Sequence, residues 1–251
     1  MTTTRARQWI VTAKPNPTAR LRFFCFPYAG GSALTFRRWP EFLPQSVEIC
    51  AVQLPGRGSR MHEPPFSSIS SLIPVLAQVL AQYRDMPMAF FGHSMGGIIA
   101  FELARYLRRE HDRSVAHLFV SGSRAPQVQF DEPSTFDLPD PEFVEELRAL
   151  NGTPQEVLEY PELLELMIPL LRADFALCET YQYYPERPLD CPITVLGGLR
   201  DRAMTREDLE AWREQTTASF SLRMLPGDHF FIRTAQPLLS QVLAQDLARL
   251  I

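Results

Sequence analysis

The sequence of 251 residues lacks the features that mark a membrane or secreted protein. No stretch approaches the roughly 18 uninterrupted apolar residues that indicate a membrane-spanning helix. Residues 1–17 contain Arg5 and Arg7, but no apolar run that would form the core of a secretory signal peptide. We therefore expect no membrane association and a cytoplasmic location.

Clustered cysteines and an excess of basic residues are also absent. The four cysteines form no Cys-x-x-Cys pair, which argues against a metal cluster and a disulfide framework. They are Cys25, Cys50, Cys178 and Cys191. The net charge of −4 and the isoelectric point near 5.8 argue against a nucleic-acid partner, because nucleic-acid-binding domains usually have a basic patch and an isoelectric point above about 9.

Apolar side chains are plentiful, at 45% of residues, and the chain length fits one α/β domain with or without an inserted subdomain. Short apolar runs alternate with helical patterns, which predicts a largely parallel β-sheet with helices on both faces. The predicted strands are Leu21–Pro27, Val47–Leu54, Met88–Gly92, His117–Ser121, Ile193–Gly197 and Phe220–Leu225. The predicted helices include Ser71–Tyr83, with Pro74 in its first turn, Gly97–Arg109, Arg206–Gln215 and Gln236–Leu250.

Approximately residues 124–188 interrupt this alternation. The segment contains no convincing strand, only helical patterns at Pro141–Leu150, Pro154–Glu159 and Glu162–Tyr181. It is much longer than one crossover helix needs, and open α/β sheets bind ligands at the carboxyl ends of their strands. We therefore predict a helical lid inserted over those strand ends, within a single domain that spans residues 1–251.

The run Gly92-His93-Ser94-Met95-Gly96 matches the Gly-x-Ser-x-Gly pattern of a nucleophile elbow. The pattern alone is common, and an idle serine in a glycine-rich turn is the alternative. Here, however, it follows the apolar run Met88–Phe91 and precedes the helical pattern Ile98–Ala104, which is the strand–turn–helix context that an elbow needs. Ser94 is thus the predicted nucleophile, at a helix N-terminus that favours developing negative charge.

A serine hydroxyl needs a base to take its proton, and in this fold an acid and then a histidine follow the serine in the chain. His229 is the downstream histidine that lies on a loop after the last predicted strand, so it is the predicted base. His111 belongs to a charged helical stretch and His117 opens a strand. His93, next to the nucleophile, is expected to serve packing.

Asp201 is the predicted acid, because it lies just past the strand Ile193–Gly197 at the correct end of the sheet. Asp190 precedes that strand and so lies at the wrong end. Asp228 is adjacent to His229, and a sequence neighbour rarely has the geometry to accept the ring N–H.

Two backbone N–H groups are predicted to form the oxyanion hole that stabilises a tetrahedral intermediate. One is that of Met95, directly after the nucleophile. We assign the other to Ala29, in the loop Phe26-Pro27-Tyr28-Ala29-Gly30-Gly31-Ser32 that follows the first predicted strand. A plain Gly-Gly turn is the alternative.

Several segments together resemble one family, the type II (editing) thioesterases of polyketide synthase and nonribosomal peptide synthetase pathways. Besides the oxyanion-loop and elbow segments, they are Val52-Gln53-Leu54-Pro55-Gly56-Arg57, Leu171-Arg172-Ala173-Asp174, Pro188-Leu189-Asp190-Cys191-Pro192 and His229-Phe230-Phe231. The resemblance covers nearly the whole chain. It departs from the family at Gly198, often acidic in relatives, at Arg202, often proline, and at Asp228, often glycine.

The resemblance implies an α/β-hydrolase fold and a stand-alone, monomeric enzyme. Such an enzyme hydrolyses stalled or aberrant acyl groups from the phosphopantetheine arm of acyl or peptidyl carrier proteins, through an acyl-serine intermediate. No metal or organic cofactor is required.

Apolar and aromatic side chains of the lid are candidates for the acyl pocket, although helix–helix packing is the bland alternative for each. With Tyr28, they are Phe143, Leu147, Met167, Leu170, Leu171 and Phe175. Arg57, Arg60 and Arg172 are candidates for contact with an acidic carrier protein, although a solvated arginine is the commoner case.

Three other functions stay open. A general carboxylesterase or lipase would use the same triad and prefer oxygen esters. An acyltransferase or cyclase would pass the acyl group to a nucleophile other than water. A non-enzymatic scaffold with a hydrolase fold would typically lose a triad member, and none is missing here.

Overall fold

The computed structural model describes residues 8–128, 133–150 and 159–251. One seven-stranded sheet has the order β1-β3-β2-β4-β5-β6-β7, in which β1 runs antiparallel to β3 and all other neighbours are parallel. The strands are β1 Ile10–Val11, β2 Leu21–Phe26, β3 Val47–Val52, β4 Met88–His93, β5 Leu118–Ser121, β6 Ile193–Gly198 and β7 Phe220–Leu225. The predicted α/β architecture is confirmed.

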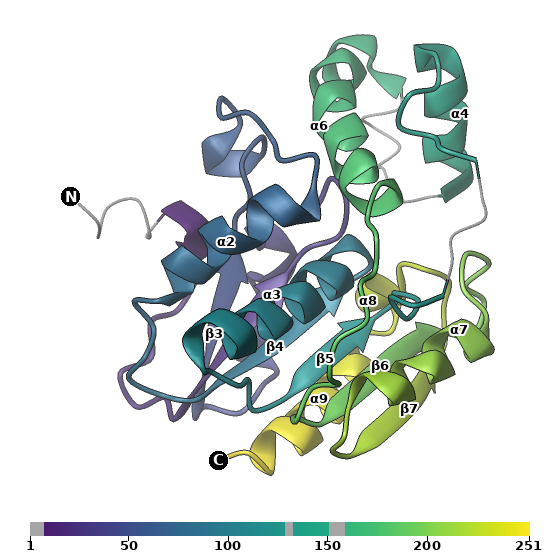
Figure 1. The fold of residues 1–251 in the computed structure, drawn as a ribbon. Coiled ribbons are helices and arrows are strands. Elements are labelled where there is room, and N and C mark those ends of the chain that lie inside the picture. The colour runs from purple at the N-terminus through teal and green to yellow at the C-terminus, as the bar shows by residue number, and fades with distance from the viewer. Residues whose placement is uncertain (1–7, 129–132, 151–158) are drawn as a thin grey trace.

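Helices cover both faces of the sheet (Figure 1). The α-helices of the described residues are α2 Ile69–Leu80, α3 Met95–His111, α4 Asp140–Leu150, α6 Pro161–Glu179, α7 Arg206–Glu210, α8 Phe231–Thr234 and α9 Gln236–Ala248. Alternate strand side chains point to opposite faces. In β2, Phe24 and Phe26 join the core beneath α2 and α3, whereas Phe23 and Cys25 join the core beneath α8 and α9.

The predicted elements differ from the observed ones mainly at their ends. Helix α2 begins at Ile69, so Pro74 lies in its second turn rather than in the first. The predicted helix over residues 206–215 is α7 followed by a 3-10 helix over Ala211–Gln215. Strand β1 was not predicted, because two residues are too short to show an alternating pattern. The predicted helix over residues 154–159 falls almost entirely outside the described residues.

Helices α4 and α6 lie between β5 and β6 in the chain and side by side beyond one end of the sheet (Figure 1). A small core joins them, with Phe143 and Leu147 of α4 against Leu171 of α6. The contacts of α6 show which end of the sheet this is. Leu171 packs at Gly30, after the carboxyl end of β2, and Leu170 packs at Gly56, after that of β3.

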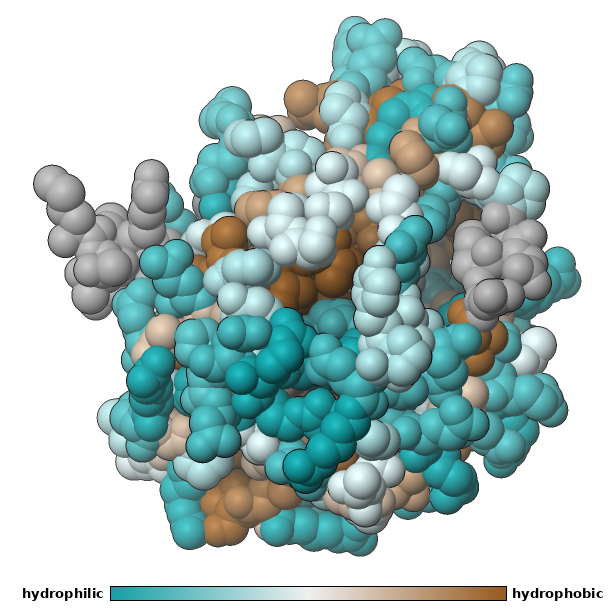
Figure 2. Space-filling view, in the orientation of Figure 1, coloured by the Kyte–Doolittle hydropathy of each residue, from teal (hydrophilic) through white to brown (hydrophobic). Residues whose placement is uncertain are grey.

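Several large apolar side chains of this insertion are exposed, and Figure 2 shows apolar surface over the same region. They are Leu150, Tyr160, Leu163 and Leu166. No helix in the described parts of the chain is long and apolar enough to span a bilayer.

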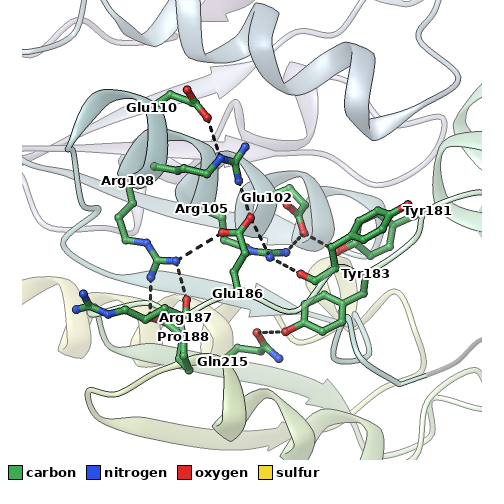
Figure 3. Close-up of polar contacts among 12 residues, drawn as sticks. Glu102, Arg105, Arg108, Glu110, Tyr181, Tyr183, Glu186, Arg187, Pro188 and Gln215 are labelled. Carbon is green, nitrogen blue, oxygen red and sulfur yellow. Dashed lines mark hydrogen bonds and ion pairs between the residues drawn. The ribbon is translucent and has the colours of Figure 1, made fainter.

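The chain returns from α6 to the sheet along α3, where arginines of that helix hold it (Figure 3). Arg105 pairs with Glu102 and donates to the carbonyl of Tyr184, and Arg109 pairs with Glu186. A cavity of about 570 Å³ lies between this segment, α2 and α3. None of Ser94, Asp201 and His229 lines it, so it is not the site of the predicted chemistry.

Candidate active site

Ser94 lies on a strained turn between β4 and α3. Its φ of 53° and ψ of −120° fall where residues other than glycine are rarely found. A Cβ on Gly92 would lie 1.9 Å from the carbonyl oxygen of Gly96, and one on Gly96 would lie 2.2 Å from that of Phe26. Both flanking glycines are therefore sterically required, because a side chain at either position would collide with a backbone carbonyl.

His229 and Asp201 come from different loops and meet beside this turn. Nδ1 of His229 lies 2.8 Å from Oδ2 of Asp201, whose side chain is only 2% exposed. The other oxygen of Asp201 accepts the Ala203 N–H at 3.0 Å, which orients the carboxylate. Asp228, the rival acid, instead accepts the backbone N–H of Phe230. The predicted acid–histidine pairing is thus present, and it leaves Nε2 of His229 turned from Asp201.

The end of β5 brings the elbow and His229 together. The Ser94 N–H donates to the carbonyl of Ser121 at 2.7 Å, and a Cβ on the next residue, Gly122, would lie 3.4 Å from Cε1 of His229. Within the described residues, no hydrogen bond joins the Ser94 hydroxyl to His229. Such bonds are often long in ligand-free enzymes and tighten when substrate binds.

His93 is completely buried, as expected for a packing residue, but it also touches the site. Its Nδ1 lies 2.9 Å from the Ser121 hydroxyl, and its ring lies 5.3 Å from that of His229. Its Nε2 has no hydrogen-bond partner within the described residues. Burial holds the pKa of His93 well below its usual range, so this second imidazole is neutral. The motif gave no signal for this contact with His229.

The loop after β2 forms a tight turn from Tyr28 to Gly31. The Gly31 N–H donates to the Tyr28 carbonyl at 2.8 Å, and Gly30 has a φ of 74°, the values of a type II turn. In such a turn the N–H of the second residue, Ala29, points outward. The Met95 N–H, at the first residue of α3, lies outside the hydrogen-bond ladder of the helix. Neither of the two predicted oxyanion donors is therefore used in the hydrogen bonds of its own turn or helix.

A cavity of about 340 Å³ lies between this turn and α6. Three of the predicted pocket residues, Tyr28, Met167 and Leu171, line it together with Arg233. Phe143 and Leu147 are buried in the small core of the insertion, with Phe175 packed against them. Leu170 is buried against the loop at Gly56. Some of the predicted pocket residues thus line the cavity, whereas the others pack in the interior behind it.

Arg57 and Arg60 are each only 5% exposed, so the prediction that they contact a carrier protein is wrong. Arg57 forms a buried ion pair with Asp174 of α6. Arg60 donates to the carbonyl of Gln53 and packs over the ring of Trp9. A sequence pattern does not distinguish a buried, paired arginine from a solvated one. Arg172, the third candidate, is bonded to the carbonyl of Phe136 and to Asp140 within the insertion.

No group of three or more His, Cys, Asp or Glu side chains in the described ranges could hold a metal ion. The family model for the thioesterase domain matches residues 22–245. The chain belongs to the thioesterase family. It is therefore a hydrolase that acts on thioesters, and the resemblance inferred from its motifs is confirmed.

Among curated relatives, this thioesterase is 46% identical to the gramicidin S biosynthesis protein GrsT of Aneurinibacillus migulanus, over 91% of this chain and 89% of that protein. Among solved structures, it is similar to RedJ, a thioesterase of the prodiginine pathway in Streptomyces coelicolor (TM-score 0.87, 40% identity, 92% of each chain). It is also similar to BorB, a type II thioesterase of the borrelidin cluster (TM-score 0.86, 37% identity, 94% of this chain and 96% of that one). Its matched relatives thus include type II thioesterases.

Proposed function

We propose that this thioesterase edits a polyketide or nonribosomal peptide assembly line by hydrolysing acyl groups from the phosphopantetheine arm of its carrier proteins. Ser94 is the nucleophile, His229 the base and Asp201 the acid. The observation that carries the proposal is the hydrogen bond between His229 and Asp201, beside a strained serine elbow, in a chain of this family.

The reaction has two halves. The Ser94 hydroxyl attacks the thioester carbonyl while Nε2 of His229 takes its proton, and Asp201 stabilises the imidazolium. The tetrahedral intermediate collapses, the C–S bond breaks, and the thiol leaves with the proton from His229. A thiol, with a pKa of about 8.5, needs less help from this proton than an amine does. Water, deprotonated by His229, then cleaves the acyl-Ser94 ester and releases the acid.

Backbone N–H groups of Ala29 and Met95 hold the oxyanion in both halves. Residues 124–188 act as the lid, and the cavity lined by Tyr28, Met167 and Leu171 is the proposed entrance to the acyl pocket. The α4 side chains Phe143 and Leu147, with Phe175 and Leu170 of α6, support this wall. The cavity's position against the turn that carries Ala29 supports this assignment.

The proposed setting is a monomer in the cytoplasm, which acts on carrier proteins of one pathway. All four cysteines are free, which fits a reducing compartment. The partner of the enzyme is the acidic carrier protein, and the thioester at the end of its arm is the substrate.

Hydrolysis of an acyl-phosphopantetheinyl carrier protein, compared with an equivalent oxygen ester, tests the proposal. Turnover of the carrier thioester is expected to exceed that of the oxygen ester and to vanish in Ser94→Ala. A preference for the oxygen ester, with no gain from the carrier, would favour a general esterase. Release of an ester or amide instead of the free acid would favour an acyltransferase.

A further inference from the structure

The carboxylate of Asp174, on α6, joins the insertion to two loops at the carboxyl end of the sheet. Its side chain is only 1% exposed. It accepts two hydrogen bonds of 2.7 Å from the guanidinium of Arg57 and one of 2.7 Å from the backbone N–H of Gly30. A bidentate arginine on a carboxylate fixes its orientation as well as its position.

Arg57 is itself held on several sides. Its Nη1 donates to the carbonyl of Gly31 and its Nε to that of Pro55. Its own carbonyl accepts from the Gln53 side chain, whose oxygen accepts the N–H of Ala33. The carboxylate of Asp174 is therefore part of a buried hydrogen-bond network. If it moved away, the guanidinium of Arg57 would be left as an unpaired buried charge.

The bond to Gly30 matters because of the turn in which this residue lies. Two consecutive peptide units surround Ala29. The Tyr28–Ala29 peptide is fixed by the hydrogen bond that its carbonyl accepts from the Gly31 N–H. The Ala29–Gly30 peptide is fixed by the hydrogen bond that its N–H donates to Asp174. With both planes fixed, the backbone angles of Ala29 are fixed, and so is the direction of its N–H.

Leu171, one helical turn before Asp174, closes on the same residue. A Cβ on Gly30 would lie 2.8 Å from Cδ2 of Leu171, so the helix packs directly on the turn. Helix α6 thus contacts Gly30 with one apolar and one charged side chain. Both contacts lie one residue from the proposed oxyanion donor.

We propose that Asp174 is a positioning residue for the oxyanion hole: it holds the Ala29–Gly30 peptide so that the Ala29 N–H meets the developing oxyanion. The hole is then complete only while α6 is seated on the turn, which links the position of the lid to the chemical step. This inference rests on the proposed role of Ala29. It does not depend on a carrier protein, because an oxyanion forms on any thioester or ester that Ser94 attacks.

Asp174→Asn tests the proposal, with Asp140→Asn as the matched control. Asp140, in α4, pairs with Arg172 of α6, the helix that carries Asp174, but it is far more exposed and has no bond to the turn. Both variants would be assayed on an acyl-N-acetylcysteamine thioester and on a p-nitrophenyl ester. Two inhibitors would separate binding from chemistry: a trifluoromethyl ketone, which forms an oxyanion with Ser94, and a thioether that lacks the carbonyl and forms none.

For Asp174→Asn we expect kcat to fall by about 10- to 100-fold, since a misplacement near 1 Å can cost about 100-fold. Affinity for the trifluoromethyl ketone falls by a similar factor, while KM and the affinity for the thioether stay within about twofold, a split that only transition-state binding produces. Asp140→Asn keeps wild-type values. Unchanged kcat, equal losses of affinity for both inhibitors, or the same loss in Asp140→Asn would each overturn the proposal.

Asp174→Glu serves if Asp174→Asn does not fold. The longer side chain keeps its charge opposite Arg57 but moves the acceptor relative to Gly30, so the same split between the two inhibitors is expected. A folded Asp174→Glu enzyme with wild-type kcat and trifluoromethyl ketone affinity would contradict the role. If the wild-type enzyme showed no preference for carrier-bound thioesters, that result would contradict the proposed function. It would not affect this test of Asp174.

Discussion

Oδ2 of Asp201 lies 2.8 Å from Nδ1 of His229, although 28 residues separate the two side chains in the chain. The acceptor fixes the tautomer, because a carboxylate at Nδ1 keeps the proton there and leaves Nε2 free to accept one. The exposure of the two side chains differs in the way that this role requires. Asp201 is 2% exposed and His229 is 17% exposed, so the acid is shielded from solvent while the ring faces the site.

Asp201→Asn is therefore expected to lower kcat by about 10²- to 10⁴-fold, because the amide can donate to Nδ1 and stabilise the wrong tautomer. KM changes little, and the loss shrinks at high pH as hydroxide replaces the base. Steady-state hydrolysis of an acyl-N-acetylcysteamine thioester measures both constants. Asp228→Asn is the control, since its amide oxygen still accepts the Phe230 N–H. Comparable losses in the two variants would argue against Asp201 as the acid.

A substitution at Arg60 tests whether this side chain stabilises the fold or binds a carrier protein. Its guanidinium is buried over Trp9 and donates to the Gln53 carbonyl and to Glu63. Arg60→Glu should lower the free energy of unfolding by about 3–5 kcal/mol, because it buries an unpaired charge. Activity on carrier-bound and small thioesters should fall by the same factor.

The control for Arg60→Glu is Arg38→Glu, at a side chain that is 67% exposed, pairs with Glu41 and lies over the ring of Phe42. Its effect on unfolding should stay within about 1 kcal/mol. Urea unfolding measures both variants. An Arg60→Glu protein of normal stability with a selective loss on carrier substrates would restore the docking role.

The sequence identified the parts of the site that depend on local geometry. The elbow at Ser94 follows from steric limits on a tight turn, and the loops that hold Asp201 and His229 follow from strands with clear apolar patterns. Most of these strands are short, nearly continuous apolar runs, because both faces of the parallel sheet are covered. Helix ends were less accurate, since α2 accommodates Pro74 in its second turn.

The long-range pairings were not predictable from the sequence. Arg57 and Asp174 are 117 residues apart, and either could equally have been solvated. The contact between His93 and His229 depends on how the sheet brings the end of β4 near the loop that follows β7. The lid candidates divide between cavity and core because the crossing of α4 over α6 decides which side faces inward, and a helical period does not encode that crossing.

Acid should destabilise the protein through His117. This histidine is buried between Phe119 and Thr194, and burial lowers its pKa from 6.5 to about 4. Below pH 6.5 His117 therefore binds a proton in the unfolded chain but not in the folded one. The free energy of unfolding is highest above pH 6.5 and falls as the pH drops toward 4. Between pH 7 and pH 4.5 this one group removes about 2–3 kcal/mol.

Urea unfolding of the wild type and of His117→Gln at both pH values measures this loss. Glutamine does not titrate and can still reach the Thr194 hydroxyl. The other buried histidine, His93, is present in both proteins, so its contribution cancels in the comparison. We expect the variant to lose about 2–3 kcal/mol less than the wild type over this range. Parallel pH profiles for the two proteins would show that His117 titrates normally or is not responsible.

The strain at Ser94 predicts an unusual order of stability for two inactive variants. Replacing alanine by glycine normally lowers the stability of a protein, because glycine has more conformational freedom in the unfolded state. At Ser94, however, the φ of 53° penalises any residue with a Cβ by about 1–3 kcal/mol. Ser94→Gly relieves this penalty and Ser94→Ala does not.

Ser94→Gly is therefore expected to be more stable than Ser94→Ala by about 1 kcal/mol, and to melt about 2–4 °C higher. Neither variant has a nucleophile, so any difference between them reports backbone strain and not catalysis. Calorimetry of both proteins at pH 7.5 measures it. An alanine variant as stable as the glycine variant would mean that the turn holds Ser94 without strain. The rigidity of the elbow would then come from Gly92 and Gly96, whose close carbonyl contacts leave no room for a side chain.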